Sequence, residues 1–266
     1  MLFYKTDDEI EHIRRSCHFV CRTIAHVGSL IRPGVSGKFL DDAAETFILD
    51  QNGKPAFKGY RGFPNTLTVS INEQVVHGIP TEREVNDGDV VTIDCGIEFE
   101  GFFGDAAYTF AVGNVKPEVM KLLTITNRSL YRGIEFAVSG KRLGDVSFAI
   151  QDYCERANNF GVVRELVGHG IGRSMHEEPD VPNYGRRGQG LLLREGLVIA
   201  IEPMVNFGKK DIRQLPDGWT IYTKDGKPAA HYEHTVAIRR DKADILSDHS
   251  YIEEAIKKNV ELREIN

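Results

Sequence analysis

The sequence predicts an α+β fold in which helices cover antiparallel sheets and the chain consists of two similar halves. Helix-like stretches followed by strand-like runs occur twice along the 266 residues. Three segments recur in the same order, namely residues 35–40 at 138–143, residues 77–79 at 169–171, and residues 88–94 at 196–202. Ordered recurrence of this kind predicts an internal duplication about a pseudo-twofold axis. We therefore expect one domain over residues 1–266, with halves at about 1–115 and 116–240.

Two helices and two pairs of strands are expected in the first half. Thr6 precedes an acidic turn and a periodic apolar pattern, which is typical of a capped helix that runs to about Gly28. Pro33-Gly34 interrupts the chain, and Ser36 starts a second helix that ends near residue 50. Residues 66–79 predict a strand pair leading to His77, and residues 90–110 predict a hairpin.

The same order of elements begins again after Lys116. Helices are expected from residue 117 to about 137 and from about 144 to 158, and residues 161–167 lead toward His169. Later strands are expected at 197–205, 219–223 and 229–239. A charged helix from about Ser250 completes the prediction.

The hairpin at residues 90–110 carries two carboxylates, Asp94 and Asp105, eleven positions apart. A hairpin-length reversal between them allows both to reach one side of an antiparallel pair. Buried carboxylates cost free energy unless they are paired or bind a metal, so two that share a pocket predict a cation site. The alternative is that one is a turn residue and the other caps a helix, and the hairpin alone favours neither.

The duplication indicates where further ligands lie. If Asp94 corresponds to Glu202, then Asp105 needs a counterpart on a later strand, and Glu233 is the candidate. These two glutamates are 31 positions apart rather than 11, which implies an inserted excursion of about 20 residues through Trp219. One of the equivalent pair His77 and His169 would complete the set.

Four carboxylates and an imidazole form an oxygen-rich site that suits Mn²⁺, Co²⁺, Fe²⁺ or Zn²⁺. Two divalent ions would remove the repulsion between the carboxylates, with Asp105 and Glu233 as bridging ligands and the ions ~3.5–4 Å apart. Such a pair lowers the pKa of a water and polarises a carbonyl, which fits peptide hydrolysis. Since no GxSxG or HExxH motif is present, serine hydrolase and zincin chemistry have no support.

Composition excludes several other classes. The net charge is −6 and no Lys/Arg block is present, so neither nucleic acid nor an anionic membrane is expected as the main partner. No apolar run approaches the ~20 residues of a membrane span, and the N-terminus lacks the apolar core of a signal peptide. Four cysteines without disulfide-framework spacing predict a reducing cytoplasm.

Six stretches together carry a resemblance to a known family: SINEQVVHGIP (70–80), DGDVVTIDCG (87–96), GFFGDAA (101–107), GHGIGRSMHEEP (168–179), LVIAIEPM (197–204) and YEHTVAI (232–238). From the first helix to about Arg239 the chain resembles the type I methionine aminopeptidases, the short bacterial kind within the M24 peptidases, which have the pita-bread fold. The resemblance implies a catalytic pita-bread domain. It also implies a metal-dependent exopeptidase that removes the initiator methionine and prefers a small second residue.

The resemblance also assigns roles to residues. Asp94, Asp105, His169, Glu202 and Glu233 match the family's metal ligands, so of the two equivalent histidines only His169 is expected to bind metal. His77 matches the histidine that contacts substrate and intermediate, and His176 the one near the scissile carbonyl. Glu202 matches the presumed proton shuttle. The alternatives are hydrogen bonds to backbone for His77 and His169, and an exposed salt bridge for His176.

By the same resemblance the methionine pocket is lined by Tyr60, Phe63, Thr68, Met175 and Trp219, beside Phe57, which we expect to be a core residue. Aromatic edges suit a thioether. Relatives often carry cysteine at the positions of Phe57 and Thr68, which leaves the shape of the pocket open.

Two rival functions remain. One is a proline-specific peptidase of the same fold, although these usually carry an extra N-terminal domain. The other is a pita-bread binding protein without catalysis, although such proteins typically lose ligands. We expect a cytoplasmic monomer that acts on the N-terminal methionine of nascent peptides, and the sequence leaves contact with the ribosome open.

Overall fold

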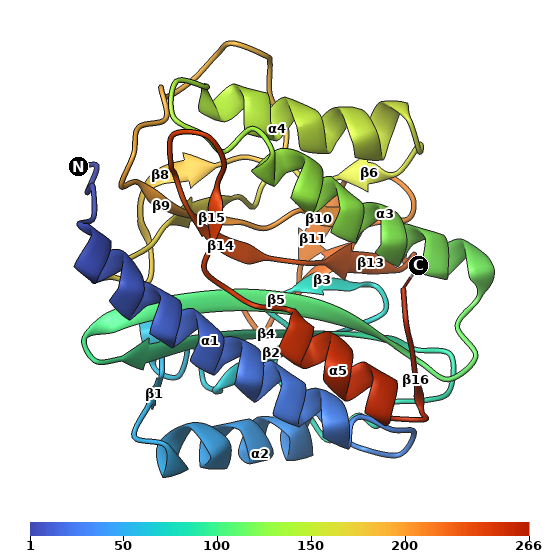
Figure 1. Ribbon diagram of the computed structural model, residues 1–266. Helices are drawn as coiled ribbons and strands as arrows, with labels where there is room; N and C mark the ends of the chain where they lie inside the picture. Colours follow the sequence, from blue (N-terminus) through green and yellow to red (C-terminus); the bar gives the residue numbers. More distant parts are fainter. Residues whose placement is uncertain (266) are drawn as a thin grey trace.

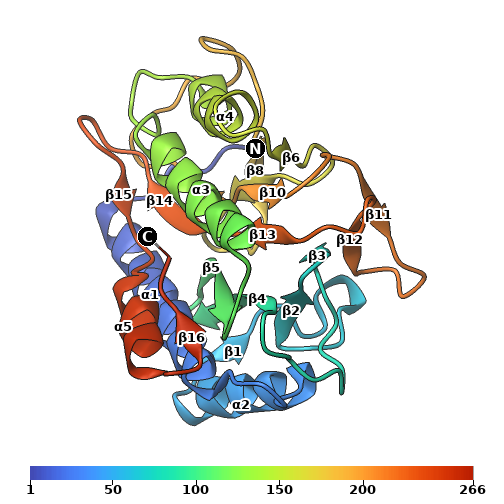
Figure 2. The same cartoon turned by 90° about the vertical axis from the view of Figure 1, so that its right-hand side faces the viewer.

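The structure, a computed structural model, describes residues 1–265 and contains two main sheets, one built largely from each half of the chain (Figure 1). Helices of the first half and the last helix cover the lower sheet, and two helices of the second half lie above the upper one (Figures 1 and 2). None of the helices described in residues 1–265 is long and apolar enough to cross a membrane.

The helices begin where the sequence predicts them. Thr6 and Glu9 form a reciprocal capping box, and the Ser36 hydroxyl accepts from the Phe39 amide. The fourth α-helix ends at Gln151, earlier than expected, because the chain continues as a π-helix, Asp152–Arg156. The helices are α1 (Asp7–Leu30), α2 (Gly37–Asp50), η1 (Tyr60–Gly62, 3₁₀), α3 (Pro117–Ile134), α4 (Leu143–Gln151) and α5 (Ser250–Lys258).

The first sheet is organised around the predicted hairpin, which is confirmed. Its long strands β4 (Val90–Phe99) and β5 (Phe102–Val112) pair with Asp94 opposite Ala107 and Gly96 opposite Asp105. Because side chains alternate between the faces of a strand, this register puts both aspartates on the same face. The sheet is completed by β1 (Lys54–Pro55), β2 (Leu67–Ile71) and β16 (Leu262–Arg263).

The second sheet brings the two glutamates together. Strands β9 (Val198–Ile201) and β14 (His234–Ala237) are antiparallel, and their ladder ends with His234 opposite Ile201. Glu233 and Glu202 are the next residue on each strand, directly beyond that last pair. The other strands of this sheet are β7 (Gly168–Gly170), β8 (Glu177–Val181) and β15 (Asp244–Ile245).

The expected excursion lies between these glutamates and forms part of two smaller sheets. The hairpin at its centre, β11–β12, pairs with β3 of the first half, away from the helices (Figure 2). The strands are β3 (Gln74–Val76), β6 (Gly161–Val162), β10 (Met204–Asn206), β11 (Ile212–Gln214), β12 (Ile221–Thr223) and β13 (Ala229–His231).

The two halves meet along β5 and the segment from β13 to β14. The Glu233 amide donates to the Ala107 carbonyl at 3.0 Å, and the Thr235 hydroxyl donates to the Asp105 carbonyl at 3.0 Å. The order of helix, helix and strands occurs once on each side of this seam. The duplication itself and the division of the domain at about residue 115 stay predictions.

Candidate metal centre and substrate pocket

A cavity of about 150 Å³ lies at the seam between the halves. Both sheets contribute to it, together with the segment around η1 and the turns at His77, His176 and Trp219. It is lined by Phe57, Tyr60, Arg61, Phe63, Thr68, His77, Asp94, Asp105, His169, His176, Glu202, Trp219 and Glu233. All the predicted site residues except Met175 therefore line one cavity.

The carboxylates in the cavity are buried, and several of their oxygens have no partner. Asp94, Asp105 and Glu233 are 7%, 4% and 2% exposed. Among residues 1–265, nothing hydrogen-bonds to Asp94 Oδ1, Asp105 Oδ1 or Glu233 Oε1. Buried polar atoms are nearly always satisfied, so orphaned oxygens that face a common cavity indicate a ligand that completes them.

Crowding of like charges changes the acidity of this cluster. Burial raises the pKa of all four carboxyl groups, and Asp105 raises the pKa of Asp94, Glu202 and Glu233 further by repulsion. In the protein alone, burial and mutual repulsion therefore favour the protonated forms of these groups more than in an isolated carboxyl group. A bound cation would favour their ionised forms, which are also the forms that bind metal.

The orientation of His169 prepares one of its ring nitrogens for a ligand. Its Nδ1 lies 2.8 Å from the Gly170 carbonyl, which can only accept, so Nδ1 carries the proton. The free lone pair is then on Nε2, which lies 3.5 Å from Asp105 Oδ2 and 3.8 Å from Glu202 Oε1. A backbone carbonyl that fixes the tautomer in this way is typical of metal-binding histidines.

The donor set fits divalent metal ions. One ligand atom each from Asp105, His169 and Glu233 lie within 4.8 Å of one another, and all three residues are buried. Asp94 and Glu202 line the same space and couple electrostatically to Asp105. Oxygen donors with one imidazole and no thiolate suit hard or borderline divalent ions.

His77 and His176 lie beside this cluster. The ring of His176 is 4.2 Å from that of His169, and its Nδ1 is 3.0 Å from the Tyr60 hydroxyl. Desolvation by the surrounding protein lowers the pKa of His176 to about 3, and the neighbouring His169 ring and Arg61 guanidinium disfavour its charged form further. Burial also lowers the pKa of His77. Both rings are therefore neutral at pH 7, although an edge of His176 faces solvent.

Aromatic side chains form the opposite wall. Phe63 and Trp219 meet edge to face at 5.2 Å, and Thr68 Oγ1 lies 3.5 Å from Asp94 Oδ2. Phe57, expected in the core, is half-buried and lines the cavity as well as packing against the core. Met175 lies behind this wall, and a Cβ added to Gly96 would be 2.7 Å from both Met175 Cε and Phe57 Cε1.

Two residues in or beside the cavity were not singled out from the sequence. Arg61 lines it in a left-handed conformation, with φ of 50° between two glycines that also have positive φ. His231 is 1% exposed, and its Nε2 lies 3.7 Å from Glu202 Oε2. A signal was available for His231, because it is two positions from Glu233 within the strand predicted at 229–239, and alternation along one strand would put both on one face. In the structure the strand is broken between them, because β13 ends at His231 and β14 begins at His234.

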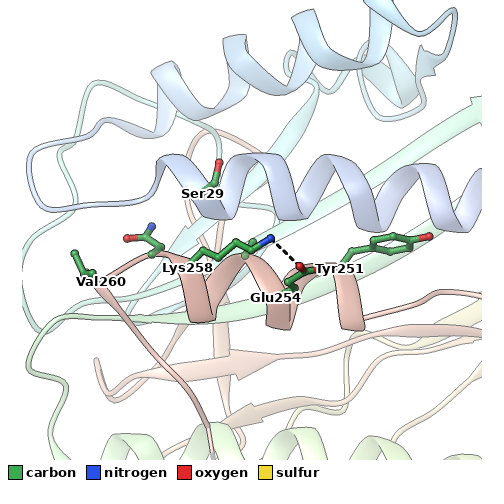
Figure 3. A pocket seen from close by; sticks show the side chains of 7 residues that line it. Ser29, Tyr251, Glu254, Lys258 and Val260 are labelled. Atoms are coloured by element: carbon green, nitrogen blue, oxygen red, sulfur yellow. Dashed lines mark hydrogen bonds and ion pairs between the residues drawn. The ribbon is translucent and has the colours of Figure 1, made fainter.

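A larger hollow of about 360 Å³ lies elsewhere, between α1 and α5 (Figure 3). It is lined by exposed side chains such as Lys258 and Glu254, which form an ion pair at 2.7 Å. Since no buried titratable residue lines it, its size alone does not make it the functional site.

Known proteins are similar to this chain in both sequence and fold. Residues 11–240 match the family described as metallopeptidase family M24. A methionine aminopeptidase of Clostridium perfringens is 49% identical over 247 residues, which cover 93% of this chain and 99% of that protein. A methionine aminopeptidase of Bacillus subtilis is 46% identical with the same coverage.

Solved structures of related proteins have the same fold as this chain. The crystal structure of methionine aminopeptidase from Rickettsia prowazekii superposes with a TM-score of 0.91 at 36% identity, covering 93% of this chain and all of that one. The prolidase from Pyrococcus furiosus, at 22% identity and a TM-score of 0.74, shows the shared fold alone. The predicted pita-bread fold is thereby confirmed, and the chain belongs to metallopeptidase family M24, within which it is a member of the methionine aminopeptidases.

Proposed function

We propose that this protein hydrolytically removes the initiator methionine from nascent polypeptides and prefers a small second residue. The observation that carries the proposal is a single cavity in which four carboxylates and His169 face an aromatic wall. Such a cavity offers a metal centre for hydrolysis and an apolar pocket for one side chain. The names of the similar proteins support the same reaction.

We further propose that Asp94, Asp105, His169, Glu202 and Glu233 hold two divalent ions, which are Co²⁺, Mn²⁺, Fe²⁺ or Zn²⁺. The orphaned carboxylate oxygens and the fixed tautomer of His169 support this ligand set. When bound, the ions would lower the pKa of a water and polarise the peptide carbonyl.

The other polar residues would act on the substrate directly. Neutral His77 and His176 would donate hydrogen bonds to the scissile carbonyl as negative charge develops on its oxygen. The contact of His176 Nδ1 with Tyr60 leaves Nε2 free for this role. Glu202, whose pKa is raised by burial, would accept a proton and pass it to the leaving amine.

The pocket would select an unbranched side chain. Phe57, Tyr60, Phe63, Thr68 and Trp219 surround the space beside the carboxylates, and about 150 Å³ leaves room for little more than one long side chain. Aromatic edges contact a thioether favourably, whereas a charged side chain would lose its hydration there. Met175 would support this wall from behind.

We also propose a cytoplasmic monomer that meets nascent chains as they leave the ribosome. All the cavity residues come from one chain, so the site needs no second copy. All four cysteines are free and buried, which suits a reducing compartment.

A peptide-release assay tests the proposal. Metal-stripped protein with added Mn²⁺ or Co²⁺ should release methionine from Met-Ala-Ser but nothing from Ala-Pro-Ser. Excess EDTA should abolish release and added metal should restore it. Glu233→Ala should lose activity and bind fewer than two ions per chain by elemental analysis.

Other outcomes favour the rivals. Cleavage of Ala-Pro-Ser would identify a proline-specific peptidase. No turnover of either peptide with two ions bound would indicate a binding protein and overturn the proposal.

A further inference from the structure

The turn that carries His176 is held by a buried ion pair that involves the N-terminal segment. This turn connects β7 to β8 and presents Met175 and His176 to the site region. Glu177, the residue after His176, directs its carboxylate back into the turn. Its Oε1 accepts from the amides of Arg173 at 3.0 Å and Ser174 at 3.3 Å.

The other oxygen of Glu177 binds Lys5. Lys5 Nζ lies 2.5 Å from Glu177 Oε2 and also donates to the Phe3 carbonyl at 3.2 Å. The two side chains are only 5% and 6% exposed. Loss of either partner would leave the other charge buried and unpaired, which a protein avoids by rearranging. The pair therefore constrains both the turn and the segment that carries Lys5.

The backbone around Lys5 is itself anchored to the second sheet. The Lys5 amide donates to the Gly196 carbonyl at 2.7 Å. Tyr4 forms an isolated β-bridge with Leu197, the residue immediately before β9, and β9 is the strand that leads to Glu202. Leu2 forms an isolated β-bridge with Glu178 on β8. Lys5 is thus a fixed point from which Glu177 and its turn are positioned.

Gly172 shows how closely this assembly is packed. A Cβ added there would lie 2.5 Å from Lys5 Cε and 2.8 Å from Glu177 Oε1. The Gly172 carbonyl accepts from the Phe103 amide at 2.8 Å, so the turn is also tied to β5, the strand of Asp105. Only a residue without a side chain allows the ion pair to approach the turn this closely.

We propose that Lys5 and Glu177 are positioning residues that set the location of the His176 ring relative to the metal cluster. The inference rests on the proposed function, because His176 is the group through which they would act. Neither residue lines the cavity. Displacement of a catalytic group by about 1 Å can cost on the order of 100-fold in rate.

The test uses Lys5→Met with Lys5→Arg as the conservative variant, assayed on Met-Ala-Ser with metal restored. Lys5→Met should lower kcat about 10- to 100-fold and change KM little, because the His176 contact strengthens only in the transition state. Lys5→Arg keeps the charge and should recover most of the activity. Glu177→Gln keeps an acceptor for the turn but loses the charge, and should lower kcat less than Lys5→Met.

A double-mutant cycle distinguishes positioning from general stabilisation. If Lys5 acts through His176, then Lys5→Met should lower kcat little in a His176→Ala background. The control is Arg14→Met, which breaks a half-buried ion pair with Asp244 at 2.7 Å. Neither of these residues lines the cavity, so this variant should leave kcat unchanged.

The outcomes separate the two claims. An inactive wild-type protein in this assay overturns the proposed function. If the wild type is active, two results overturn the positioning role alone. One is a Lys5→Met variant with full kcat. The other is a Lys5→Met substitution that lowers kcat by the same factor with His176 present as in the His176→Ala background. Thermal unfolding of each variant checks that it is folded at the assay temperature, so that differences in kcat do not reflect unfolded protein.

Discussion

At the scale of single residues, the site combines groups that are unfavourable in isolation. Glu233 is almost fully buried with one oxygen unpartnered among residues 1–265, and Asp105 repels it. His169 is fixed with its free nitrogen toward the same carboxylates. The buried and mutually repelling carboxylates cost stability in the metal-free protein, and a bound cation would offset that cost.

His231 provides a prediction at this scale. Its Nε2 lies 3.7 Å from Glu202 Oε2, close enough for a small shift to make a hydrogen bond that orients this carboxylate. His231→Leu removes the donor and should lower activity or metal affinity about 10- to 100-fold. His231→Gln retains a donor and should be less impaired. Isothermal titration with Mn²⁺ and the peptide assay measure both effects, and equal behaviour of the two variants would rule out an orienting role.

The sequence identified candidate residues that belong to long motifs and missed those whose place beside the site depends on three-dimensional contact. Asp94 and Asp105 could be paired because a hairpin has a fixed period, and the repeat pointed to Glu202 and Glu233. Lys5 could not be linked to Glu177, because their meeting depends on how the N-terminal segment crosses the second sheet. Arg61 carries no periodic signal, since it lies in an irregular left-handed segment.

At the scale of elements, long periodic segments were predictable and short ones were not. The hairpin β4–β5 and the helices α1 and α3 begin close to where their patterns predict. Strands β1, β15 and β16 have two residues each, too few to show an alternation, and they form because a longer neighbour offers its edge. The early end of α4 reflects a π-helix, which hydrophobic period alone does not reveal.

The junction before α5 gives a prediction for pH dependence. His249 is 3% exposed and stacks on His234 with ring centroids 3.7 Å apart. Burial lowers the pKa of His249 to about 4, and the Glu233 carbonyl and Asp248 oppose this only in part. Because the folded pKa is below the unfolded value of about 6.5, the unfolded chain binds more protons between these values. This histidine therefore reduces folding stability as pH falls below about 6.5.

The variant that tests this is His249→Phe, which keeps an aromatic ring against His234 without the titration. In urea unfolding at pH 7, 6 and 5, the free energy of unfolding of the wild type should fall with decreasing pH more steeply than that of the variant. The difference should reach up to about 1.4 kcal/mol per pH unit below pH 6.5. If the free energy of unfolding depends on pH in the same way in both proteins, His249 does not titrate in this way.

At the scale of the whole molecule, the metal centre depends on how the two halves are joined. The first half supplies Asp94 and Asp105, and the second supplies His169, Glu202 and Glu233. Neither half holds the full ligand set, so the distance between the proposed ligands is set by the hydrogen bonds of the seam. Thr109 on β5 is central to these bonds, because its hydroxyl contacts both backbone groups of His231.

Replacement of Thr109 tests the seam and its link to the metal centre. Its hydroxyl donates to the His231 carbonyl at 2.7 Å, accepts from the His231 amide at 3.0 Å and lies 2.8 Å from the Thr92 hydroxyl. Thr109→Val is nearly isosteric but leaves three buried polar groups unpaired, so unfolding free energy should fall by about 2–5 kcal/mol. Thr109→Ser keeps the hydroxyl and should lose only about 1 kcal/mol for the missing methyl.

Because the seam also sets the spacing of the ligands, Thr109→Val should bind Mn²⁺ more weakly than Thr109→Ser under conditions in which both are folded. Urea unfolding of the metal-free variants and calorimetric titration with Mn²⁺ separate the two effects. Equal metal affinity despite a large difference in stability would mean that the ligands are positioned within each half rather than by the joint between them.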